Sequence, residues 1–66
     1  MDARSLFKVG QRVKFVEDPL HEVDNSCPMA VVGFYEDFVI VHCDEGPINS
    51  LGDTAALYYK SVLEIV

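Results

Sequence analysis

Hydrophobic and polar residues alternate along several short stretches of the chain, with the period of two that is typical of β-strands. In the clearest stretch Val13 and Phe15 fall on one face, and the cations Arg12 and Lys14 fall on the other. Further segments rich in β-branched and aromatic residues follow it along the chain. The pattern predicts five short strands, at residues 12–16, 29–35, 38–43, 56–60 and 63–66.

Turn residues and strand breakers separate these segments. Gly10 precedes the first strand as a turn residue, and Asp18-Pro19 ends that strand because proline cannot donate to a β-ladder. Only Glu36-Asp37 lies between the second and third strands, which predicts a tight hairpin. Longer polar loops are expected at residues 17–28 and 44–54.

The last part of the chain allows two interpretations. A helix over residues 54–65 is the alternative to strands, but Leu57, Val62 and Ile65 do not share one helical face. We therefore expect a strand, a single 3-10 turn at Ser61-Val62 and a short last strand. Gly33 inside the second strand predicts a bulge or a sharp bend. The fold class is then all-β, with residues 1–66 forming one small, partly open, five-stranded barrel.

The apolar content of the chain exceeds what one small core can cover. Half of the 66 residues are apolar, whereas a domain of this size buries only about 60% of its unfolded surface. A contact between copies would cover the excess, so we expect a homo-oligomer with two-fold symmetry. No apolar run approaches the roughly 18 residues of a membrane span, and no signal peptide is recognisable. The expected location is cytoplasmic, without membrane contact.

The formal net charge of −6 is unevenly distributed along the chain. Residues 1–15 carry a net charge of +3, whereas residues 16–66 carry −9. This uneven charge favours head-to-tail contacts between copies, or a basic peptide or protein as partner. Nucleic acid is disfavoured, because most of the surface repels a phosphate backbone. An alternative role as an RNA-binding accessory protein would depend on four cations near the N-terminus: Arg4, Lys8, Arg12 and Lys14.

Residues that ligate metals or act as nucleophiles are few. Cys27 and Cys43 are the only cysteines, and we expect free thiols, with an intrachain disulfide as the open alternative. The two cysteines, His21 and His42 lack the spacing of a zinc site. His42 and Cys43 are neighbours in a predicted strand, so they point to opposite faces. We expect Cys43 to pack with Val39 and Val41, and His42 to share its face with Phe38 and Ile40.

Acidic residues gather in the first long loop without forming a recognisable site. Their spacing matches no calcium-binding loop, so a solvated acidic loop is expected. His21 and Cys27 also fall in this loop, and a loop is a poor platform for a Cys-His pair. We therefore expect no catalytic residue, no metal and no cofactor. The acidic residues are Glu17, Asp18, Glu22 and Asp24.

Five aromatic residues form the candidate binding groove. Neighbouring residues of a strand point to opposite faces. At least one ring of the pair 34–35, and at least one of the pair 58–59, must therefore face outward. Outward rings beside acidic loops suit a basic or methylated side chain through cation–π and charge attraction. The alternative is that the rings fill the core or a contact between copies. The candidate residues are Phe34, Tyr35, Phe38, Tyr58 and Tyr59.

Three segments resemble the small SH3-like barrels. Phe7-Lys8-Val9-Gly10-Gln11-Arg12-Val13 is similar to their opening "φ-x-x-G-D-x-V" strand, with Gln11 where Asp is common. Cys27-Pro28-Met29-Ala30-Val31-Val32-Gly33 resembles the "G-P-x-M-x-V" second strand of a family of short, uncharacterised bacterial proteins of this type. The closing residues 59–66 resemble the usual 3-10 turn and "L-E-x-V" strand. The resemblance implies an SH3-like barrel and a non-catalytic protein-interaction module, but it is not specific for function.

A more distant resemblance is to the type II, plasmid-borne dihydrofolate reductases, which are SH3-like barrels and homotetramers. Residues 9–13, 32–35 and 62–64 carry it. The Val-Gln-Ile-Tyr strand that lines the pore of those enzymes corresponds here to Ala56-Leu57-Tyr58-Tyr59, which retains only the tyrosine. The activity is therefore not carried over. A small oligomeric enzyme, with its site in a pore lined by Leu57 and Tyr59, remains the rival of the binding module.

Overall fold

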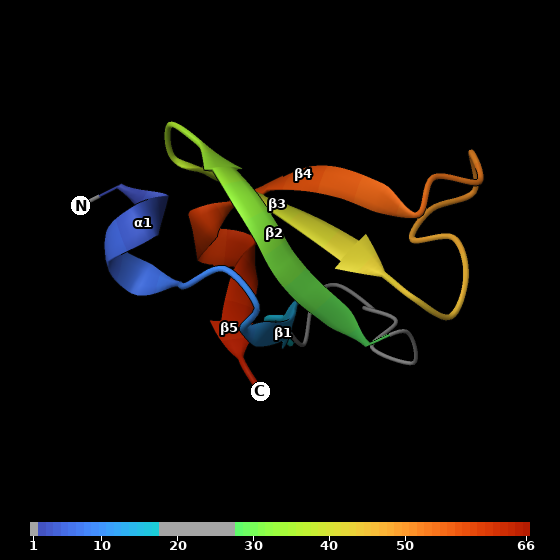
Figure 1. Cartoon of the computed structure of the whole chain (residues 1–66), viewed down its shortest axis with the longest axis horizontal. Coiled ribbons are helices and arrows are strands. Elements are labelled where there is room, and N and C mark those ends of the chain that lie inside the picture. The colour runs from blue at the N-terminus through green and yellow to red at the C-terminus, as the bar shows by residue number, and fades with distance from the viewer. Residues whose placement is uncertain (1, 18–27) are drawn as a thin grey trace.

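The computed structural model describes residues 2–17 and 28–66. They form one antiparallel sheet with the strand order β4-β3-β2-β1-β5 (Figure 1). The predicted strands are confirmed, and their ends differ from the prediction by at most one residue. The strands are β1 (Arg12–Phe15), β2 (Met29–Tyr35), β3 (Phe38–Cys43), β4 (Ala55–Tyr59) and β5 (Leu63–Ile65).

The segment after the second loop is extended, so the helix considered for residues 54–65 is wrong. The 3-10 turn η1 (Lys60–Val62) separates β4 from β5, one residue longer than predicted. Pairing decides the conformation here, because β4 hydrogen-bonds along β3 and β5 hydrogen-bonds along β1. These ladders satisfy the backbone groups of a segment that has no continuous helical face.

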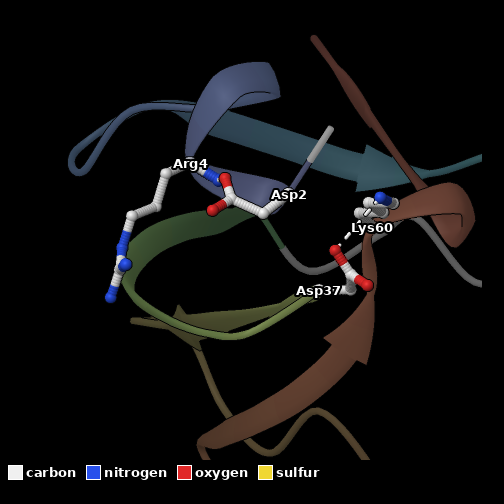
Figure 2. A network of polar contacts seen from close by, with 4 residues as sticks. All are labelled: Asp2, Arg4, Asp37 and Lys60. Atoms are coloured by element: carbon white, nitrogen blue, oxygen red, sulfur yellow. Dashed lines mark hydrogen bonds and ion pairs between the residues drawn. The ribbon is translucent and has the colours of Figure 1, made fainter.

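A short helix near the N-terminus was not predicted from the sequence. Helix α1 (Ala3–Leu6) begins after Asp2, whose carboxylate accepts a hydrogen bond from the Arg4 backbone N–H at 3.0 Å (Figure 2). This is the usual arrangement of an N-cap. The helix lies beside β2, and it brings Ala3 and Phe7 into the core.

The hairpin between β2 and β3 has the predicted two-residue connection. Tyr35 pairs with Phe38, and Glu36 in the turn takes a left-handed φ of 52°. The register shifts between Val31 and Gly33, which confirms the irregularity expected at the glycine. Because this shift adds one residue to β2, it reverses which side chains beyond it face the core.

The all-β class is confirmed, whereas closure of the sheet into a barrel is not shown. Among the described residues, β4 pairs only with β3 and β5 pairs only with β1, so each is an edge of the sheet. The barrel therefore remains a prediction.

One face of the sheet, together with α1, forms the core. Alternate positions of β3 are fully buried there, and the side chain of Phe15 from β1 packs against them. The side chains on the opposite face of β3 are only half-buried. The core residues are Ala3, Phe7, Val13, Met29, Val31, Val39, Val41, Cys43 and Leu63.

Cys43 is disulfide-bonded in the structure, which corrects the expectation of a free thiol at this position. Its side chain is buried with Val39 and Val41, as predicted. Stable disulfides are typical of oxidising compartments, so this bond does not favour the cytoplasmic location expected from the sequence. Cys27 lies outside the described residues.

Within residues 2–17 and 28–66, no helix has the length and apolar character needed to cross a membrane.

Candidate functional site

Three neighbouring strands present an apolar surface on the side of the sheet that faces away from the core. The register of β2, β3 and β4 places their outward side chains in rows that run across the strands. One row is aromatic and joins Tyr35, Phe38 and Tyr59. The next row joins Gly33, Ile40 and Leu57. A third row of mostly small residues consists of Ala30, His42 and Ala55.

We call the six large apolar residues of this surface the outer apolar face. Val32, the extra residue of the bulge, projects on this side beside the middle row. Tyr35 is 60% exposed and Val32 is 52% exposed, and Leu57 and Tyr59 are exposed to a similar degree. Neighbouring exposed apolar side chains of this kind are typical of interaction surfaces. The outer apolar face consists of Val32, Tyr35, Phe38, Ile40, Leu57 and Tyr59.

The structure divides the five aromatic residues of the candidate groove between the two faces. Tyr35, Phe38 and Tyr59 lie together on the outer apolar face. Phe34 and Tyr58 pack against the core on the other side of the sheet. The five rings therefore do not line one common surface.

The candidate groove predicted from the sequence contained only aromatic residues, although Ile40 was expected on the face of Phe38 and Leu57 was named beside Tyr59 for the rival pore. Ile40 and Leu57 lie two positions from Phe38 and Tyr59 in their strands, so they share the same side. Val32 is the aliphatic member that was not expected at a site.

The aromatic end of the outer apolar face is held by specific contacts. The rings of Phe38 and Tyr59 meet edge to face with their centroids 5.4 Å apart. The Nζ atom of Lys60 lies 6.0 Å from the centre of the Tyr59 ring, and it forms an ion pair with Asp37 at 3.1 Å. Figure 2 shows this pair between the hairpin turn and η1. Tyr59 therefore already has a cation of its own chain beside its ring.

On the core side, Tyr58 lies edge to face against Phe15 with ring centroids 4.9 Å apart. Burial raises the pKa of Tyr58 above its usual value of 10.0, and the negative charge of Asp53 raises it further. Asp53 belongs to the loop between β3 and β4, whose backbone the side chain of Asn49 organises. The Asn49 side-chain oxygen accepts hydrogen bonds from the N–H groups of Leu51 and Asp53, and its amide donates to the Asp53 carboxylate.

Only some of the residues considered for metal binding and catalysis lie in the described part of the chain. The Nδ1 atom of His42 lies 3.0 Å from a carboxylate oxygen of Asp44. His42 shares its face with Phe38 and Ile40, as predicted. Within residues 2–17 and 28–66, no three His, Cys, Asp or Glu side chains are grouped so that they could hold a metal ion. His21, Asp18, Glu22 and Asp24 lie outside the described residues.

The four cations near the N-terminus do not lie on the outer apolar face. Arg12 and Lys14 occupy alternate positions of β1, and Lys14 pairs with Glu64 of β5 at 3.4 Å. Arg4 belongs to α1, and Lys8 lies in the turn before β1. One cation of the set is therefore already partly neutralised by a carboxylate.

Comparison with protein-family models, with curated proteins and with solved structures finds no match for this chain. The resemblances to SH3-like barrels and to type II dihydrofolate reductases therefore stay predictions.

Proposed function

We propose that this protein is a non-catalytic protein-interaction module that self-associates, with the outer apolar face as the contact surface. One observation supports this most directly. Six large apolar side chains on three adjacent strands face away from the core, and the core is complete without them. Covering such a surface with another protein releases water from it, which favours association.

The charges around the surface favour a second copy over a basic partner. The outward positions of β2, β3 and β4 hold no Lys, Arg, Asp or Glu. The cation-binding side of the Tyr59 ring is also approached by Lys60 of the same chain. An uncharged apolar surface is best matched by another such surface.

The rows of the outer apolar face are complementary to those of a second copy. When two copies pack face to face about a two-fold axis that runs along the middle row, the aromatic row of one lies over the small-residue row of the other. Tyr35 then lies over Ala30 and Tyr59 lies over Ala55 of the other copy, whereas Phe38 lies over His42. Ile40 and Leu57 meet their counterparts. Large side chains opposite small ones allow close packing of two sheets.

The barrel is part of the same proposal. We infer that the sheet curls into a small SH3-like barrel, because β2 pairs with β1 at its start and with β3 along its length. The bulge at Val31–Gly33 supplies the bend that such a strand needs.

The effect of Val32→Asp on the mass of the protein in solution tests the contact. Val32 is 52% exposed, so an aspartate is tolerated by the fold but places a charge in each half of a symmetric contact. We expect the dissociation constant of the wild-type assembly, measured by sedimentation equilibrium, to rise at least tenfold. Val9→Asp is the matched control, because Val9 is 66% exposed and lies outside the outer apolar face.

The effect of salt on association distinguishes a second copy from a basic partner. Two copies with a net charge of −6 each repel one another, so added salt strengthens their association. Binding of a basic partner weakens with salt instead. An assembly whose mass is insensitive to Val32→Asp would contradict the proposal.

A further inference from the structure

Strand β4 is an edge of the sheet that lacks the usual protection against pairing. The structure describes β3 on one side of it and no strand on the other. Natural edge strands are commonly protected by charged residues, prolines or bulges, or by being very short. Edge strand β5 has three residues and carries Glu64, whereas β4 has five residues, Ala55-Ala56-Leu57-Tyr58-Tyr59, and none is charged.

The hydrogen bonds of β4 show which backbone groups face this free edge. Cys43 N–H donates to the Thr54 carbonyl at 2.8 Å, and Lys60 N–H donates to the Asp37 carbonyl at 3.0 Å. Since alternate residues of an antiparallel strand bond to the same neighbour, the even-numbered residues of β4 face β3. The N–H and C=O groups of Ala55, Leu57 and Tyr59 therefore point to the free edge.

We propose that this edge pairs with the same edge of a second copy, antiparallel about a two-fold axis at Leu57. In this register Leu57 lies opposite Leu57 of the other copy, and Ala55 lies opposite Tyr59. Residues whose backbone N–H and C=O groups point to the free edge are thus paired with one another. This is the arrangement that a hydrogen-bonded pair of an antiparallel sheet requires. The paired strands join the two sheets into one.

Side-chain size supports this register. On the outer apolar face, each Tyr59 ring lies opposite the small Ala55 of the other copy. On the core side, Tyr58 lies opposite Ala56 in the same way. An antiparallel pair centred on Leu57 therefore places every tyrosine beside an alanine, so the rings have room on both faces of the joined sheet.

Charge supports the antiparallel direction. Asp53 precedes β4 and Lys60 follows it, so antiparallel pairing brings the acidic end of one strand to the basic end of the other. A parallel pair would place like charges together at both ends. Opposite charges across neighbouring strands are favourable, and like charges are not.

The edge contact depends on observations that differ from those behind the face-to-face contact, and it extends the self-association proposed above. A protein with two different symmetric contacts assembles beyond a dimer. We therefore expect the wild-type assembly to be larger than a dimer, with each contact removable by its own substitution.

Leu57→Pro tests the edge contact. It removes an N–H that points to the free edge and leaves the hydrogen bonds between β4 and β3 in place, which is the position that an edge strand allows for proline. Leu57→Ala is the matched control, since it removes most of the same side chain from the outer apolar face and keeps the N–H. We expect Leu57→Pro to raise the dissociation constant of the assembly at least tenfold more than Leu57→Ala does, and equal effects of the two variants would overturn the edge contact.

The two proposals fail in different ways. If Leu57→Pro leaves the mass unchanged while Val32→Asp lowers it, edge pairing is wrong and the face-to-face contact stands. If only Leu57→Pro lowers the mass, the face-to-face contact is wrong. If both contacts exist, each single variant lowers the mass and the combined variant gives a monomer.

Crosslinking gives a second test that does not depend on proline. Paired residues of a hydrogen-bonded antiparallel pair have Cα atoms about 5.5 Å apart, a separation that a disulfide can span. In the Val32→Asp variant, whose face-to-face contact is removed, Leu57→Cys is therefore expected to form a covalent dimer under mild oxidation, whereas Val9→Cys is not. Equal crosslinking of both variants, or none at Leu57→Cys, would overturn the proposed register.

Discussion

Shortening Val41 to alanine tests which face of the sheet is the core. Val41 is fully buried and belongs to the same cluster as Val31, its partner across β2 and β3. Removing two buried methyl groups costs about 1.6 kcal/mol in transfer free energy, and the cavity adds to it, so we expect a loss of about 2–3 kcal/mol.

This loss is large for a chain of 66 residues. At 0.05–0.15 kcal/mol per residue, the whole free energy of unfolding is about 3–10 kcal/mol. The Val41→Ala variant is therefore close to the limit of folding, and its Tm should fall by about 10–20 °C.

The same substitution at an exposed valine provides the control. Val9 is 66% exposed, so Val9→Ala should change the free energy of unfolding by no more than about 0.5 kcal/mol. Urea unfolding followed by circular dichroism measures the free energy of unfolding of both variants. The protein concentration is kept the same, because association adds to stability. If both substitutions have equal effects, the assignment of the buried face is wrong.

Two further predictions concern the loop before β4 and the tyrosine behind it. Asn49→Ala removes the three side-chain hydrogen bonds that organise this loop. We expect the free energy of unfolding in urea to fall by about 1 kcal/mol, and an unchanged value would show that the loop does not need these bonds. The pKa of Tyr58 is raised in the folded chain, so the unfolded chain loses the phenolic proton first and stability falls as the pH rises above about 10. Tyr58→Phe removes this titration and should flatten the fall, with the exposed Tyr35→Phe as the control for loss of a hydroxyl; an unchanged slope would contradict the assignment.

The strands could be predicted from the sequence because their alternation reflects a single buried face. The short helix α1 was missed because four residues are too few to show a helical period, although Asp2 was a recognisable N-cap. The conformation of residues 55–65 was open to two interpretations, and tertiary pairing with β1 and β3 decided it.

Two features decide which side chains form the outer apolar face: the bulge in β2 and the register of β4 against β3. Neither can be predicted from the sequence of a single strand. Strict alternation from the buried Val31 would have placed Tyr35 inward, but the bulge adds a residue and turns Phe34 inward instead. In β4 the pattern alone does not decide between Tyr58 and Tyr59, and the register against Val39 and Phe38 does.

The mass of the protein in solution shows whether the chain self-associates. Sedimentation equilibrium over a range of concentrations, at low and high salt, is the measurement. We expect a reversible assembly of several 7.4 kDa chains that strengthens with salt and weakens in Val32→Asp but not in Val9→Asp. A single 7.4 kDa species at every concentration and salt would contradict it.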